Sequence, residues 1–130
     1  MVKRKVAGAA NFRKHCLANE LASAQFNLAL MSENGEGVPQ DDKDALKWYR
    51  LAAEQGHAKA QFNLGNGYSD GRGVLQDYKA AVKWYRLAAE QGYAEAQFNL
   101  GLMYDNGRGV PQDSIYAHMW WNIAASLGDD

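Results

Sequence analysis

The chain repeats its own sequence with a period of 36 residues, and this repetition constrains the fold more than any other feature. The segments that begin at Ala24, Ala60 and Ala96 all open with the letters AQFNL, and the first two continue to the same string, KWYRLAAEQG. Such a period is typical of arrays in which each unit buries its apolar face against its neighbours. We therefore predict three repeats, residues 24–59, 60–95 and 96–130, preceded by a degenerate half-repeat over residues 1–23.

Each repeat contains two stretches of helical periodicity. In the second repeat Ala60, Leu64 and Tyr68 lie four residues apart, which places them on one face of a helix. Asp77 stands where an N-cap carboxylate would begin the second helix, and Gly92 stands where a left-handed residue would end it. The sequence thus predicts an all-α chain of helix-turn-helix repeats. In the half-repeat, a separate helix over about residues 2–19 is expected to cap the array.

The turn between the two helices of each repeat reads Gly-x-Gly-Val. Its two glycines are expected to adopt positive φ, which costs glycine little. The variable residue is expected to face solvent, and the valine is expected to fill the seam between the two helices. These positions are Glu36, Arg72 and Arg108 for the variable residue, and Val38, Val74 and Val110 for the valine.

These strings resemble a known family. AQFNLGLMYDNGRGVPQD and KWYRLAAEQGYAEAQ look like the consensus of the Sel-1-like repeat family, relatives of tetratricopeptide repeats, and the resemblance extends over residues 24–128. It implies a right-handed α-α superhelix, or solenoid, whose first helices line the concave surface. It also implies a protein-interaction scaffold that binds a peptide or protein there without catalysis.

Two other functions stay open. Some cysteine-rich relatives are associated with β-lactam binding or hydrolysis, but they carry two cysteines in each repeat, whereas this chain has Cys16 alone. A purely structural, self-assembling element is the third alternative. His15, His57 and His118 lie on different units without metal-ligand spacing, and the sequence contains no nucleophile elbow and no phosphate loop. We predict no catalytic residue, no metal and no cofactor.

The predicted partner-binding residues lie on the first helix of each repeat. If Ala60, Leu64 and Tyr68 face the core, then Phe62 and Asn66 point away from it. An amide side chain can pair with both the N–H and the C=O of an extended peptide. The alternative is that the amides bond the neighbouring helix or loop and that the phenylalanines pack against the previous repeat. The candidates form an aromatic row, Phe26, Phe62 and Phe98, and an amide row, Asn27, Asn63 and Asn99, together with Asn66.

The second helix of the last repeat differs from the two before it. Met119 replaces Lys47 and Lys83, and the Trp-Tyr pair becomes Trp120-Trp121. Because a terminal repeat needs a polar outer face, this apolar helix predicts either self-association or a fragment of a longer chain. The candidates for a homo-oligomer contact are Met119, Trp120, Ile123 and Leu127. The tryptophan row Trp48, Trp84 and Trp120 is expected to pack between units.

Composition limits the partners. Fifteen Asp and Glu against 14 Lys and Arg give a net charge of −1, so the basic field typical of nucleic-acid-binding domains is missing. A mean hydropathy of −0.51 argues against membrane insertion. Arg13 and Lys14 interrupt the first apolar stretch, which is shorter than the core of a signal peptide, about 7–15 residues. We expect a cytoplasmic protein that binds neither nucleic acid nor membrane.

Overall fold

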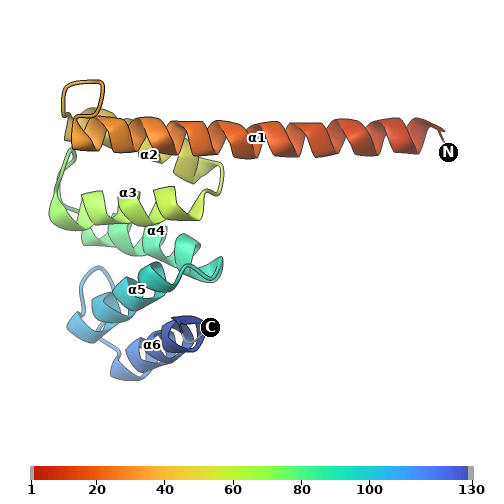
Figure 1. The fold of residues 1–130 in the computed structure, drawn as a ribbon. Coiled ribbons are helices and arrows are strands. Elements are labelled where there is room, and N and C mark those ends of the chain that lie inside the picture. Colours follow the sequence, from red (N-terminus) through yellow and green to blue (C-terminus); the bar gives the residue numbers. More distant parts are fainter. Residues whose placement is uncertain (1, 129–130) are drawn as a thin grey trace.

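Within the part of the chain that the structure describes, six helices follow one another and stack into an elongated array (Figure 1). The computed structural model describes the backbone of residues 2–128 and the side chains of residues 13–127. The main contacts join helices that are adjacent in sequence, as in a solenoid. The described chain has the predicted fold, a right-handed α-α superhelix. The helices are α1 (Val2–Asn34), α2 (Asp42–Glu54), α3 (Ala58–Asp70), α4 (Tyr78–Glu90), α5 (Ala94–Asn106) and α6 (Ser114–Gly128).

The predicted caps and turns are confirmed. Asp77 is the N-cap of α4, and its carboxylate accepts the N–H of Ala80 at 3.1 Å. Gly71 ends α3 in the left-handed conformation with a φ of 69°. Gly92 follows the last turn of α4 with a φ of 90°. Asp77 begins a helix and the two glycines end helices where the chain reverses direction, which fixes the length of the repeat.

The prediction of a separate capping helix that ends near Asn19 is wrong. Helix α1 continues without a break from Val2 to Asn34, and its first part projects beyond the other helices (Figure 1). The physical reason is local: Glu20 stands where the repeats have Gly56 and Gly92, so no left-handed residue is available to end the helix. Leu17 and Leu21 are exposed on this projecting part, whereas Ala22 is buried.

Small residues allow the helices to pack closely. Ala45, Ala60, Ala81 and Ala96 are all buried, and together with larger side chains they form two core clusters. Trp84 and Trp120 are buried in these clusters and Trp48 packs against one of them, which confirms the predicted packing role of the tryptophan row.

Two of the turn valines also pack toward the preceding repeat. Val74 packs against the first core cluster, which contains residues of α1 to α4, and lies beside Leu46 and Lys47 of α2. Val110 packs against the cluster that contains Val82. Val38, by contrast, is 42% exposed, because no second helix of a preceding repeat lies beside it.

The contact between the first two repeats depends on matched sizes. A Cβ added at Gly67 would lie 2.5 Å from Cδ1 of Leu46, so Leu46 occupies the space in which a side chain at position 67 would stand. One period later, Val82 and Met103 take these two positions within the second core cluster. A larger residue on one helix is thus matched by a smaller one on the other.

A glutamine of each first helix links neighbouring helices. The side-chain N–H of Gln61 donates to the carbonyl of Ala53 in α2 at 3.1 Å, and its oxygen accepts at 2.8 Å from Gln91, the C-cap residue of α4. Gln97 repeats the first bond, to the carbonyl of Ala89. Among the described residues the oxygen of Gln97 has no partner, because Leu127 stands where the earlier repeats have glutamine. We call this series the glutamine ladder.

Candidate partner-binding face

Two tyrosines of the second helices carry hydroxyl groups to the surface formed by the first helices, which we call the inner face. The hydroxyl of Tyr49 donates to the carboxylate of Glu33, and that of Tyr85 donates to the amide oxygen of Asn66. Burial raises the pKa of both tyrosines, and the neighbouring Glu33 carboxylate raises that of Tyr49 further. Both hydroxyls therefore stay protonated near neutral pH and act as donors.

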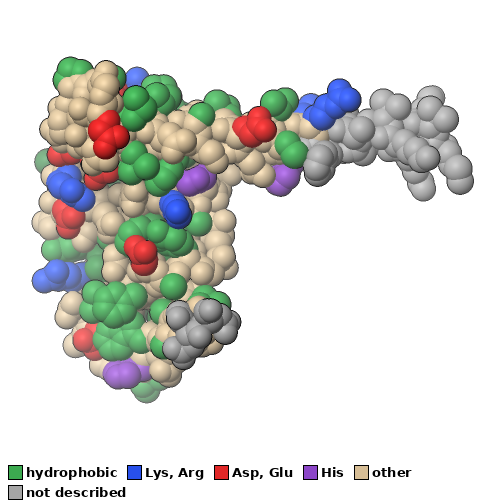
Figure 2. Space-filling model, viewed as in Figure 1, with side chains coloured by type: hydrophobic (Ala, Val, Ile, Leu, Met, Phe, Trp, Pro, Cys, Tyr) green, Lys and Arg blue, Asp and Glu red, His purple; other side chains and the backbone are tan. Residues whose placement is uncertain are grey.

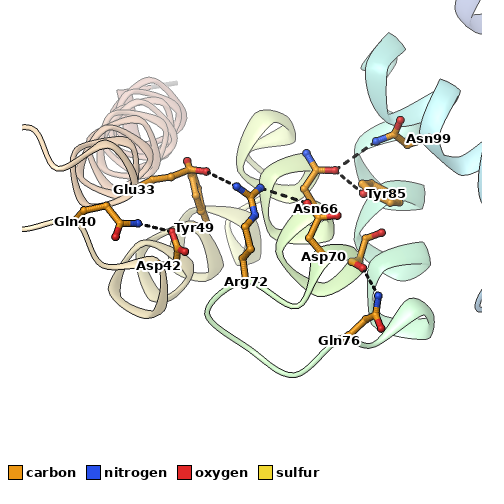
Figure 3. Close-up of polar contacts among 11 residues, drawn as sticks. Glu33, Gln40, Asp42, Tyr49, Asn66, Asp70, Arg72, Gln76, Tyr85 and Asn99 are labelled. Atoms are coloured by element: carbon orange, nitrogen blue, oxygen red, sulfur yellow. Dashed lines mark hydrogen bonds and ion pairs between the residues drawn. The ribbon is translucent and has the colours of Figure 1, made fainter.

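Arg72 crosses between repeats on the same face. Its guanidinium lies 3.8 Å from the carboxylate of Glu33 and 3.5 Å from that of Asp70 (Figure 3). The side chain is 52% exposed, as predicted for a solvent-facing residue, but it also has a position fixed by two acidic partners. Exposed ion pairs of this kind contribute at most about 1 kcal/mol, so Arg72 shapes the charge of the face more than its stability.

The amide row is only partly free. Asn27 is exposed, whereas Asn63, Asn66 and Asn99 are half-buried. The amide nitrogen of Asn99 lies 3.4 Å from the oxygen of Asn66, which also accepts from Tyr85 (Figure 3). Among residues 13–127 the nitrogen of Asn66 and the oxygen of Asn99 have no hydrogen-bond partner. One donor and one acceptor of this amide pair are thus free.

These amides border a cleft between the second and third repeats. The cleft has a volume of about 200 Å³. Helices α3 and α5 supply most of its wall, and the turn after α5 supplies Arg108. Its lining residues include Asn66, Asp70, Tyr85, Asn99, Asn106 and Arg108. The cleft is small and polar, a size that suits one side chain or a short stretch of backbone rather than a cofactor.

The aromatic row divides into two kinds of residue. Phe26 stacks on His57, with ring centroids 4.8 Å apart, and Phe62 meets Tyr93 edge-on at 5.2 Å. Both phenylalanines therefore pack against the N-cap residue of the next first helix, toward the following repeat and not the previous one. Phe98 is 50% exposed and lies beside Trp121.

Trp121 changes the inner face in the third repeat. It stands where Tyr49 and Tyr85 carry their hydroxyls, and its indole N–H donates to the carbonyl of Phe98 at 3.1 Å. An apolar groove of about 550 Å³ opens there between Phe62, Phe98, Trp121 and Ala125. Figure 2 shows apolar side chains gathered at this end of the array. Sequence reasoning missed the groove, although the exchange of tyrosine for tryptophan was visible in the repeat alignment.

One of the predicted self-association residues is not accessible. Trp120 is only 9% exposed and belongs to the second core cluster, so its proposed role in a contact between chains is wrong. Met119, Ile123 and Leu127 are 39%, 37% and 46% exposed. Met119 lies on the outer surface rather than at the end of the array, because its counterpart Lys47 is exposed although a further repeat follows it. These residues are surface positions that nothing covers among the described residues.

Comparison with known proteins agrees with the repeat pattern. The family model described as the Sel1 repeat matches three consecutive segments, residues 22–57, 58–93 and 94–129. The chain belongs to the Sel1 repeat family. Its matched segments begin two residues before the boundaries predicted from the AQFNL string. No curated protein sequence matches the chain at a significant level.

Several solved structures resemble this Sel1 repeat chain. A protective antigen of uropathogenic Escherichia coli strains, which displays an SLR fold, is 46% identical with a TM-score of 0.81, over 82% of this chain and 23% of that one. A Sel1 repeat protein from Oxalobacter formigenes is 42% identical with a TM-score of 0.80, over 83% of this chain and 44% of that one. The chain thus spans less than half the length of either protein.

A more distant structure shares the fold alone. Helicobacter pylori cysteine rich protein B is 23% identical with a TM-score of 0.70, over 98% of this chain and 92% of that one. Within residues 2–128, no helix of this Sel1 repeat chain has the length and apolar character needed to cross a bilayer.

Proposed function

We propose that this chain is a non-catalytic protein-interaction module that binds an extended peptide segment of a partner along its inner face. Sel1 repeat proteins are commonly protein-interaction scaffolds, which supports the general class. The observation that carries the proposal is that the bonded amides Asn66 and Asn99 keep one free donor and one free acceptor at the edge of the cleft between the second and third repeats. A peptide backbone presents one acceptor and one donor per residue, so this pair suits it.

The two hollows of the inner face suit different parts of such a peptide. The cleft beside Asn99 is polar and would hold a backbone segment or a polar side chain. The groove between Phe98 and Trp121 is apolar and would hold a bulky apolar side chain. A half-exposed aromatic pair of this kind is a typical anchor position in protein interfaces. The proposed ligand is therefore an extended peptide with an apolar residue next to a polar stretch.

The test uses peptides selected on the folded protein from a random displayed library. Asn99→Ala should weaken the best selected peptide about tenfold, the loss that follows when a hydrogen bond worth about 1.4 kcal/mol is removed. Phe98→Ala should weaken it as well. Asn122→Ala removes an exposed amide of α6 outside the inner face and serves as the matched control.

Thermal unfolding separates binding from stability. Equal affinity for the Asn99→Ala and Asn122→Ala proteins would contradict the proposal, as would a loss of affinity that only follows a fall in Tm. Hydrolysis of the β-lactam nitrocefin by the purified protein would contradict the non-catalytic part.

A further inference from the structure

A second groove lies on the outer surface, away from the inner face. The turn after α3 lies against the start of α2, and the groove of about 430 Å³ is formed between them. Gly73 makes this approach possible: its φ is +78°, and an added Cβ would lie 2.5 Å from the carbonyl oxygen of Asp42. We call this hollow the outer groove. Its volume falls in the range of pockets that bind ligands.

The floor of the outer groove is apolar. Leu46 of α2 is buried, and Val74 of the turn packs half-buried against the core. Leu75, next to Val74, is 91% exposed, where the other two repeats have proline. The aliphatic stems of the lysines on α2 extend this apolar surface at its sides.

The rim of the outer groove is basic. Lys43, Lys47 and Arg50 recur at intervals of four and three residues, so they line one face of α2. Among the described residues neither lysine forms an ion pair. Arg50 donates to the hydroxyl of Tyr68 and its guanidinium lies 5.7 Å from that ring, so the arginine is held in place by a neutral partner. The three positive charges are not neutralised by these contacts.

Two carboxylates also line the groove, and both already have hydrogen-bond donors. Asp41 accepts the N–H of Asp44 at 3.1 Å as the N-cap of α2. Asp44 accepts the hydroxyl of Ser32 at 2.8 Å. These contacts hold the acidic groups at the start of the helix, and the three cations outnumber them.

We propose that the outer groove binds an acidic peptide segment that carries a bulky apolar side chain. The apolar side chain rests on Leu46 and Val74, and the flanking carboxylates pair with Lys43, Lys47 and Arg50. Charge complementarity selects an acidic ligand, and the apolar floor selects a peptide over a small inorganic anion. This interaction is independent of the inner face.

The second repeat continues the same basic surface and the third repeat ends it. Helix α4 carries Lys79, Lys83 and Arg86 at the positions that correspond to the three basic residues of α2. Arg86 again donates to a tyrosine hydroxyl, that of Tyr104. In α6 these three positions are Ile115, Met119 and Asn122. An acidic segment longer than the outer groove therefore extends toward α4 and not onto α6.

The test is a nuclear magnetic resonance titration of the isotope-labelled full chain with two peptides. The probes are acetylated Glu-Glu-Phe-Glu-Glu and its counterpart Lys-Lys-Phe-Lys-Lys. The acidic peptide should shift the amide signals of Lys47 and Val74 to saturation, and the basic peptide should not. Lys47→Glu should weaken binding about tenfold, a typical effect of reversing a charge beside a carboxylate. Lys59→Glu, an exposed reversal on α3, should leave binding unchanged.

Several results would overturn the proposal. They are the absence of saturable shifts, equal shifts with both peptides, shifts centred on Asn66 and Asn99, and equal affinity for the two charge-reversal variants. Cosedimentation with phosphatidylserine vesicles, without saturable peptide binding, would reassign the surface to lipid. Circular dichroism of both variants checks that each is folded, and Lys47→Gln provides a milder change if the reversal unfolds the chain.

Discussion

Replacing Leu127 by glutamine should extend the glutamine ladder by one step. The oxygen of Gln97 is buried and has no partner among the described residues, whereas the matching oxygen of Gln61 accepts from Gln91 at 2.8 Å. Leu127 is 46% exposed and occupies the position that corresponds to Gln91. A glutamine there can donate to Gln97 as Gln91 donates to Gln61.

The expected gain follows from the cost of an unsatisfied acceptor. A buried polar group without a partner costs about 1–3 kcal/mol, and a new hydrogen bond contributes about 0.5–1.5 kcal/mol. Because position 127 is half-exposed, we take the lower part of this range, about 1 kcal/mol. For a chain of this length that is a rise in Tm of about 3–6 °C. The converse change, Gln91→Leu, should remove about 1–3 kcal/mol by leaving Gln61 without its donor.

Thermal and urea unfolding followed by circular dichroism measure both effects. Leu127→Met is the matched control, because methionine has a similar unbranched shape but no N–H. Leu127→Gln should be more stable than Leu127→Met, and the difference should vanish when Gln97 is replaced by methionine. A glutamine variant no more stable than the methionine variant, or a gain that persists without Gln97, would refute the reasoning.

Three further predictions concern single positions. Burial and the nearby Lys59 lower the pKa of His57, and its neutral ring accepts the N–H of Ala60 at the start of α3. The free energy of unfolding should therefore fall as pH drops below about 6.5. His57→Tyr should flatten this pH dependence in urea unfolding. Gly67→Ala should cost about 1–3 kcal/mol because its Cβ meets Leu46, and Leu46→Val should recover part of that loss in thermal unfolding. Gly73→Ala should lower Tm more than Gly56→Ala, because both have positive φ but only Gly73 also meets backbone, and an equal loss would contradict this.

The helices could be predicted from sequence because local chemistry sets their ends. Asp77 and Gly71 act within a few residues of their own positions, so their roles follow from the repeat alone. The same reasoning applied to Glu20, which stands where the repeats have glycine, favours a helix that continues past this position.

The inner face could be predicted only in part, because its contacts join residues far apart in sequence. The amide row was placed on the correct helices, but Tyr85 and Asn66 are 19 residues apart and Arg72 reaches back to Glu33 across a whole repeat. Repetition shows which positions are equivalent and does not show which of them touch. One signal was present: a buried tyrosine in place of phenylalanine needs a partner for its hydroxyl.

The matched sizes at Leu46 and Gly67 give the repeats a fixed order. A chain in which the second repeat was duplicated would place Val82 against a second glycine and leave a void, and a chain without the second repeat would press Leu46 against Met103. Near-identical units are therefore not interchangeable, and duplication or deletion of one unit would require a compensating change in its neighbour. The side chains at each contact between repeats fit only each other, so a repeat can be added only where its surfaces fit those of its neighbours.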